Sequence, residues 1–153
     1  MKLFFQALVV VAIVAGYFLI DFNAIYSKFQ GEGSFVVQNK ECSLKESSCA
    51  VTIEDGTVLE FEIAQKDIPL MKPLTFKLKS SNHNLENITL RIYATNMMMG
   101  TYELKFKNEG NGNYVTVGTL PTCPVGGMKW NADVQISKFS KIIGARFQFE
   151  TDI

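Results

Sequence analysis

The feature that most constrains the fold is a succession of short strand-like segments from residue 34 onwards. Most of them are rich in β-branched or aromatic residues and alternate in polarity, as in Phe76-Lys77-Leu78. Such alternation is typical of half-buried β-strands. We expect strands at 34–38, 49–53, 58–63, 74–79, 88–95, 101–107, 114–120, 130–137 and 145–150.

Clusters of turn-forming residues separate these segments, for example 54–56, 80–84 and 109–113. Gly, Asn, Asp and Ser favour turns because they accept positive φ or bond to their own backbone. No helical periodicity follows residue 33. Short strands at regular spacing predict an all-β fold, an immunoglobulin- or cupredoxin-like β-sandwich, although the strand pairing is not predicted.

The N-terminus carries a different signal. Residues 3–20 form an apolar run in which Gln6 is the only strongly polar residue. Its length approaches the roughly 20 residues that a helix needs to cross a bilayer. The alternative is a cleaved signal peptide, whose apolar region spans only about 7–15 residues before a small-x-small site. Because Ala15 and Gly16 fall inside the run, the pattern favours a retained transmembrane anchor.

The sequence therefore predicts a transmembrane anchor at 1–22, a juxtamembrane linker at 23–33 and one folded domain at 34–153. Either fate of the N-terminus takes that domain out of the cytoplasm. The charges balance, with 15 basic and 15 acidic residues. We therefore expect no nucleic-acid partner, since such proteins carry a basic surface.

Cys42 and Cys49 enclose a short polar loop. In an oxidising compartment, two nearby cysteines of an exported domain are expected to form a disulfide. Closing so small a loop contributes roughly 2–3 kcal/mol of stability. The alternative, a redox couple, is disfavoured because the spacing is not Cys-x-x-Cys and no helix start follows to lower a thiol pKa.

Soft sulfur donors gather in two segments, 96–100 and 120–130. Three of the six methionines lie in the first segment. Strand alternation would place Met98 on the core side and turn Met97 and Met99 to the other face. Thioethers favour Cu(I), so this pair is a candidate metal ligand set. The alternative is ordinary packing, because methionine often fills gaps in cores.

Cys123 is the one cysteine without an obvious partner, and Met128 and Trp130 follow it at strand-compatible spacing. An odd cysteine in an exported protein is a candidate reactive thiol or metal ligand; burial as a small hydrophobic residue is the alternative. We expect Trp130 to anchor the core. His83 is the only histidine, which excludes a blue-copper centre built from this chain alone, because that centre needs two histidines.

The pattern Asn96-Met97-x-Met99-Gly100, followed by Leu120-Pro121-x-Cys123 and then Met128-x-Trp130, resembles small membrane-anchored bacterial envelope proteins related to the YtkA-like and FixH-like β-sandwich proteins. Some of these are associated with copper handling or oxidase assembly. The resemblance implies a Cu(I) site formed by Met97, Met99 and Cys123, with Met128 as a further candidate.

The leading hypothesis is therefore a single-pass protein of the bacterial inner membrane, with its C-terminal domain in the periplasm. It would bind Cu(I) for copper tolerance or for delivery, with a copper transporter or a cuproenzyme as partner. The alternative is a metal-free interaction domain that helps to assemble an inner-membrane complex such as an oxidase. A third hypothesis is a thiol-dependent redox partner using Cys123. No catalytic constellation is present, so we expect no enzymatic activity.

We predict that the N-terminal apolar run is retained in the mature protein, because it lacks a cleavage site where one would be needed. Cell fractionation with N-terminal sequencing of the native protein tests this. A soluble mature chain that begins near residue 17 or 25 would contradict the prediction.

Overall fold

The structure, a computed structural model, describes residue 6 and residues 33–97, 100–122, 127–138 and 141–152. The chain divides into two compact units, 1–32 and 33–153. Apart from Gln6, the predicted anchor lies outside the described residues, and so does the predicted linker up to residue 32. Within the described part of the chain, no helix has both the length and the apolar character to span a membrane.

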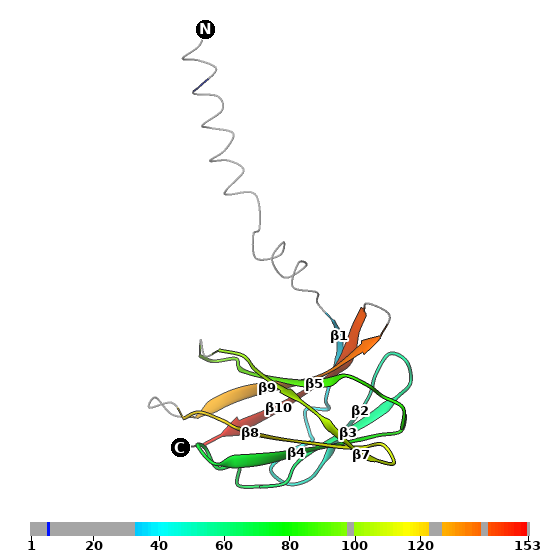
Figure 1. Cartoon of the computed structure of the whole chain (residues 1–153). Coiled ribbons are helices and arrows are strands. Elements are labelled where there is room, and N and C mark those ends of the chain that lie inside the picture. Colours follow the sequence, from blue (N-terminus) through cyan, green and yellow to red (C-terminus); the bar gives the residue numbers. More distant parts are fainter. Residues whose placement is uncertain (1–5, 7–32, 98–99, 123–126, 139–140, 153) are drawn as a thin grey trace. The chain divides into compact units, whose positions relative to one another are not determined.

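The described residues of the second unit form ten β-strands (Figure 1). They are β1 (Ser34–Val37), β2 (Cys49–Thr52), β3 (Val58–Ile63), β4 (Pro73–Ser80), β5 (Ile88–Ala94), β6 (Tyr102–Lys105), β7 (Lys107–Gly110), β8 (Asn113–Thr119), β9 (Met128–Lys138) and β10 (Lys141–Thr151). The predicted all-β class is confirmed for the described residues.

The strands form two five-stranded sheets arranged as a sandwich-like fold. Sheet A has the order β1-β10-β9-β5-β6 and sheet B the order β2-β3-β4-β8-β7. The longest pairing joins β9 and β10 in antiparallel register from Met128↔Thr151 to Lys138↔Lys141. β1 is parallel to β10, whereas the other pairings are antiparallel. The β9–β10 pair is thus the frame on which sheet A is built.

The core lies between the two sheets and is built from alternate residues of most strands, as the sequence pattern predicts. Phe61 on β3 stacks against Phe76 on β4, with ring centroids 6.1 Å apart. It also stacks against Phe147 on β10 of the other sheet, at 4.9 Å. Trp130 is 1% exposed, and its indole N–H donates to the Thr151 hydroxyl at 3.0 Å. The prediction that Trp130 anchors the core is confirmed.

The prediction of one continuous strand at 101–107 is wrong. The segment 101–107 is divided into β6, which belongs to sheet A, and β7, which belongs to sheet B. Phe106 lies at the crossing, where its backbone N–H donates to the Ile88 carbonyl at 3.1 Å. Alternation in polarity continues through such a crossing, and therefore it does not reveal that the chain changes sheets.

The strand register defines two ends of the fold. At the sulfur end lie the connections 38–48 and 64–72 and the described parts of two others, 95–97 with 100–101 and 120–122 with 127, together with the last residues of β10. At the turn end lie the connections 53–57, 81–87 and 111–112 and the junction of β9 with β10. Residue 33 precedes β1 at the turn end, because Ser34 pairs with Ile143.

The predicted disulfide between Cys42 and Cys49 is present. It ties the connection 38–48 to the start of β2, where Cys49 is fully buried. The disulfide therefore holds in place the connection that follows β1 at the sulfur end.

The outer face of sheet A carries a polar row. Asp133 on β9 is 2% exposed and accepts two hydrogen bonds from Arg146 on β10, at 2.7 and 2.9 Å. These bonds raise the pKa of the Arg146 guanidinium above its usual value, against the desolvation that lowers it. The Arg146 guanidinium also lies 5.3 Å from the Phe35 ring centroid, so β1, β9 and β10 are linked across this face.

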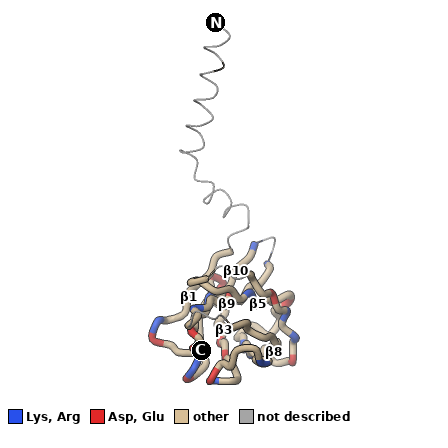
Figure 2. The backbone as a smooth tube through the Cα atoms, turned by 90° about the vertical axis from the view of Figure 1, so that its left-hand side faces the viewer, with Lys and Arg blue, Asp and Glu red and all other residues tan. Residues whose placement is uncertain are grey.

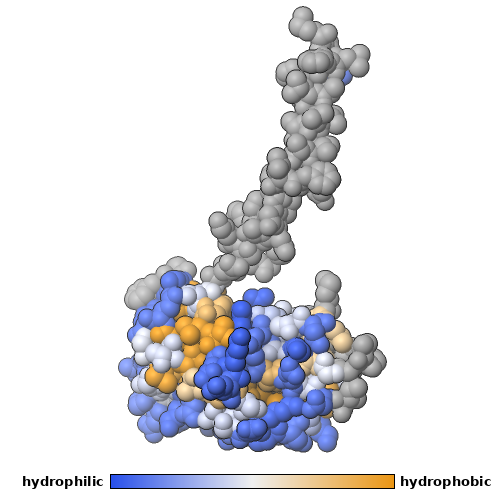
Figure 3. Space-filling view, turned by 180° about the vertical axis from the view of Figure 1, so that it is seen from behind, coloured by the Kyte–Doolittle hydropathy of each residue, from blue (hydrophilic) through white to orange (hydrophobic). Residues whose placement is uncertain are grey.

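The rest of the surface is mixed. Charges of both signs are interspersed on the side shown in Figure 2. In the view from behind, an apolar patch faces the viewer (Figure 3). Among the exposed apolar residues, Val37 on β1 is 48% exposed.

We predict that Gly144→Ala destabilises the fold by about 3 kcal/mol, the upper end of the cost of overpacking. A Cβ at this position would lie 1.9 Å from the Val134 carbonyl oxygen, a backbone atom that cannot turn aside. Gly100→Ala is the matched control, because a Cβ there would meet no atom within 4 Å; its effect should stay within about 0.5 kcal/mol. Urea denaturation measures both, and equal stability of the two variants would contradict the β9–β10 geometry.

Candidate functional site

The two sulfur-bearing segments predicted from the sequence meet at the sulfur end of the fold. Asn96 holds them together: its side-chain amide donates to the Gly127 carbonyl at 3.0 Å and accepts from the Lys129 backbone N–H at 3.0 Å. The Thr95 N–H adds a further bond to the Lys129 carbonyl at 2.8 Å. Segment 95–97 is therefore fixed alongside segment 127–129.

Met97 lies directly after this clamp. β5 ends at Ala94, three residues earlier, so the strand alternation that was used to assign a face to Met97 does not extend to it. Met97 is half-buried and packs against the hydrophobic core. It also lines a shallow open depression of about 690 Å³, together with Asn96 and Gly100. Its position therefore combines core contact with access from solvent.

Met128 begins β9 on its core face and is 1% exposed. It is paired with Thr151 in the β9–β10 ladder. Its side chain thus belongs to the core beneath the clamp.

Met99 and Cys123, the other two proposed ligands, lie outside the described residues, as does Met98. Residues near them in the sequence are described, however. Gly100 follows Met99, and Leu120, Pro121 and Gly127 lie before and after Cys123. The structure brings together the described parts of the two segments.

Met71 also lies at the sulfur end, outside the proposed ligand set, and the sequence pattern does not place it there. Its backbone N–H donates to the Leu120 carbonyl at 2.9 Å, which places the connection 64–72 beside the segment that leads to Cys123. Met71 has a positive φ of 59° and is 65% exposed. A methionine in the left-handed region and in solvent is unusual. Met71 has no other sulfur-containing residue near it in the sequence. Only the β4–β8 pairing shows that it lies close to the segment that leads to Cys123.

The side chains that could bind a metal through oxygen or nitrogen are distributed differently from the sulfur ligands. Among the described residues, no group of three or more His, Cys, Asp or Glu side chains is placed to hold a metal ion. His83 is exposed and lies in the β4–β5 connection at the turn end. A site at the sulfur end would therefore have sulfur, rather than imidazole, as its distinctive donor.

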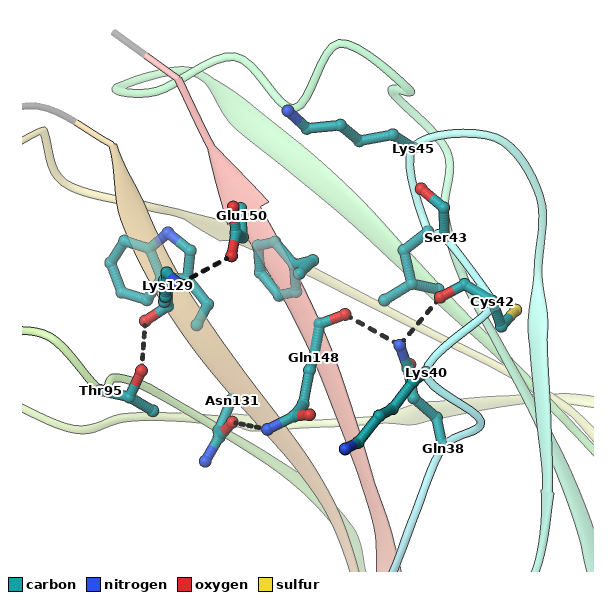
Figure 4. A pocket seen from close by; sticks show the side chains of 13 residues that line it. Gln38, Lys40, Cys42, Ser43, Lys45, Thr95, Lys129, Asn131, Gln148 and Glu150 are labelled. Carbon is teal, nitrogen blue, oxygen red and sulfur yellow. Dashed lines mark hydrogen bonds and ion pairs between the residues drawn. The ribbon is translucent and has the colours of Figure 1, made fainter.

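A second hollow lies at the same end, on the sheet A side. It is a groove of about 520 Å³ between the connection 38–48 and the ends of β9 and β10 (Figure 4). Gln38, Lys40, Asn131 and Gln148 are among the side chains that line it. The sequence predicted none of them as functional, because each is an ordinary polar residue that the fold alone brings together.

Comparison of the chain with protein-family models, with curated proteins and with solved structures gives no match.

We predict that Asn96→Ala loosens the contact between the two sulfur-bearing segments while the fold persists. Each lost hydrogen bond contributes about 1 kcal/mol at most at this exposed position. Hydrogen exchange should accelerate at the Thr95 and Lys129 amides.

Asn113→Ala is the control, since its side chain donates a single hydrogen bond to the Gly110 carbonyl at the turn end, at 3.2 Å. Unchanged exchange at Thr95 and Lys129 in the Asn96 variant would show that the clamp is not what holds the segments.

Proposed function

We propose that this chain is a membrane-anchored protein of the bacterial envelope that binds Cu(I) through methionine and cysteine sulfur. The proposed ligands are Met97, Met99 and Cys123, with Met128 as a further candidate. The anchor is the apolar run at 3–20, and the site belongs to the periplasmic domain. The bound ion would serve copper tolerance or delivery to a cuproenzyme.

The observation that carries the proposal is the Asn96 clamp. Two segments that lie about thirty residues apart in the sequence are held side by side by bonds to Gly127 and Lys129. A metal site assembled from distant segments needs such a contact, because the ligands must be positioned before the ion binds.

The chemistry of the donors supports Cu(I) over harder ions. Thioethers and thiolates are soft ligands that select Cu(I), whereas Ca²⁺ and Mg²⁺ require oxygen. Thioethers need no deprotonation, and copper binding itself favours the Cys123 thiolate. Without imidazole in the set, we expect weaker binding of Cu(II) and Zn(II) than of Cu(I).

The proposal also includes the type of β-sandwich and the N-terminal helix. We infer that the two sheets form an immunoglobulin- or cupredoxin-like sandwich, carried by an N-terminal transmembrane helix. The likeness to YtkA-like and FixH-like proteins, which rests on the spacing of the methionines and Cys123, supports the association with copper handling.

A second candidate is a metal-free interaction domain that helps to assemble an inner-membrane complex. The observation that favours it is the packing of two proposed ligands: Met128 is 1% exposed and Met97 rests on the core. Under this alternative, both side chains are packing residues and the surface, not a metal, is the functional element.

We predict that the double variant Met97→Leu/Met99→Leu binds Cu(I) at least tenfold more weakly than the wild type. Leucine keeps the hydrophobic volume nearly constant, so the fold should survive. Anaerobic titration of the full chain in detergent against a chromophoric Cu(I) chelator measures the affinity. Cys123→Ser should weaken binding further, since it removes the only anionic sulfur.

Met71→Leu is the matched control, because it removes an exposed thioether at the same end from outside the proposed ligand set. It should retain wild-type affinity. If the double variant binds Cu(I) as tightly as the wild type, the two methionines are packing residues and the metal-free alternative is favoured.

A further inference from the structure

The groove beside the connection 38–48 lies over the outer face of sheet A, at the sulfur end. Its floor includes Asn131 on β9 and Gln148 on β10. Their neighbours along the strands, Trp130 and Phe149, are buried in the core. The groove has a volume of about 520 Å³. Ligand pockets typically span about 300–1,000 Å³, so the groove has room for a small ligand that lies across the face of the sheet.

The connection 38–48 forms the wall of the groove and is fixed beside the end of β10. The Gln38 side-chain amide donates to the Gln148 carbonyl at 3.0 Å and to the Cys42 carbonyl at 3.1 Å. Lys45 pairs with Asp152 at 2.6 Å, and Cys42 is held by its disulfide. A preformed site loses less conformational entropy when it binds a ligand.

A chain of hydrogen bonds fixes the polar side chains of the floor. The Gln148 side-chain amide donates to Asn131 Oδ1 at 3.0 Å. The Asn131 amide donates in turn to the Tyr93 hydroxyl at 3.1 Å, which donates to Asp133 at 3.4 Å. Asn131 is 8% exposed, whereas Gln148 is exposed. The Gln148 amide is therefore held in one orientation at the surface, and its oxygen accepts no hydrogen bond from the described residues.

The accessible side chains of the groove are polar. The apolar residues that line it are at most 6% exposed. The exposed members of the lining are Lys40, Thr95, Lys129, Gln148 and Glu150. Together they present ammonium and amide donors beside amide, hydroxyl and carboxylate acceptors. This mixture suits a ligand rich in hydroxyl groups better than an apolar one.

One positive charge in the groove is left without a partner. Lys129 is paired with Glu150 at 3.3 Å, and Lys45 with Asp152 at 2.6 Å. Lys40 forms no ion pair with any described residue. In Figure 4 its side chain runs from the wall of the groove toward Gln148. A single anionic group on the ligand would complement this charge.

We propose that the groove binds an acidic saccharide, with a carboxylate of the sugar on Lys40 and its hydroxyls on Gln148 and Thr95. Each sugar hydroxyl both donates and accepts hydrogen bonds, as the mixed lining requires. A hydrogen bond between the carboxylate and the Lys40 ammonium is charge-assisted and stronger than a neutral one. The proposal involves no metal, so it stands whether or not the sulfur end binds copper.

The test is an NMR titration of the isotope-labelled full chain with trigalacturonic acid at neutral pH and low ionic strength. The detergent has a polyoxyethylene headgroup, because a sugar headgroup would compete. We expect saturable shifts of the Gln148 side-chain amide and of backbone amides in 40–45 and 148–150. The methyl ester of the trisaccharide keeps the ring hydroxyls and lacks the charge. It should bind at least tenfold more weakly.

Lys40→Gln should weaken binding of the acid at least tenfold, the size expected when a hydrogen bond to a charged group is lost. Binding of the ester should not change. Lys105→Gln is the matched control, since this exposed lysine lies on β6 at the other edge of sheet A. It should bind the acid as the wild type does. Gln148→Ala should weaken the acid and the ester alike, because its amide contacts hydroxyls.

Several outcomes would overturn the proposal: no binding of the acid at millimolar concentration, equal binding of the ester, or shifts confined to residues outside the groove. Displacement of the trisaccharide by acetate or phosphate at constant ionic strength would also overturn it, because that result would indicate a simple anion site. Equal weakening by Lys40→Gln and Lys105→Gln would show attraction to net charge alone.

Discussion

The eleven-residue antiparallel pairing of β9 with β10 is the constraint on which the rest of the structure depends. Inward, it contributes Trp130 and Phe147 to the core. Outward, it carries Asp133 and Arg146, whose paired hydrogen bonds satisfy a carboxylate that is 2% exposed. Removing one member of such a buried pair usually costs about 3–5 kcal/mol, because the other charge is left unpaired. At its sulfur end, the same pairing positions both the segment clamped by Asn96 and the groove.

The copper proposal needs sulfur donors from two segments that are distant in the sequence. Asn96 brings the described parts of those segments together through its bonds to Gly127 and Lys129.

Sequence patterns predicted the strands well where one face is buried: the expected strand 58–63 matches β3 at both ends. They failed where tertiary contacts decide, as at Phe106, where the chain changes sheets, and at Met97, which lies beyond the end of β5 at Ala94. The Cys42–Cys49 bridge followed from spacing and compartment. The positions of Met71 and Gln38 could not be predicted in this way, because they depend on partners that are distant in the sequence, Leu120 and Gln148.

X-ray absorption spectroscopy at the copper edge of the Cu(I)-loaded full chain tests the central claim most directly, because it identifies the atoms bound to the metal. If thioether and thiolate side chains bind the ion, sulfur alone should surround the copper. Nitrogen or oxygen neighbours in place of sulfur would contradict the claim, since those atoms belong to none of the side chains proposed as ligands.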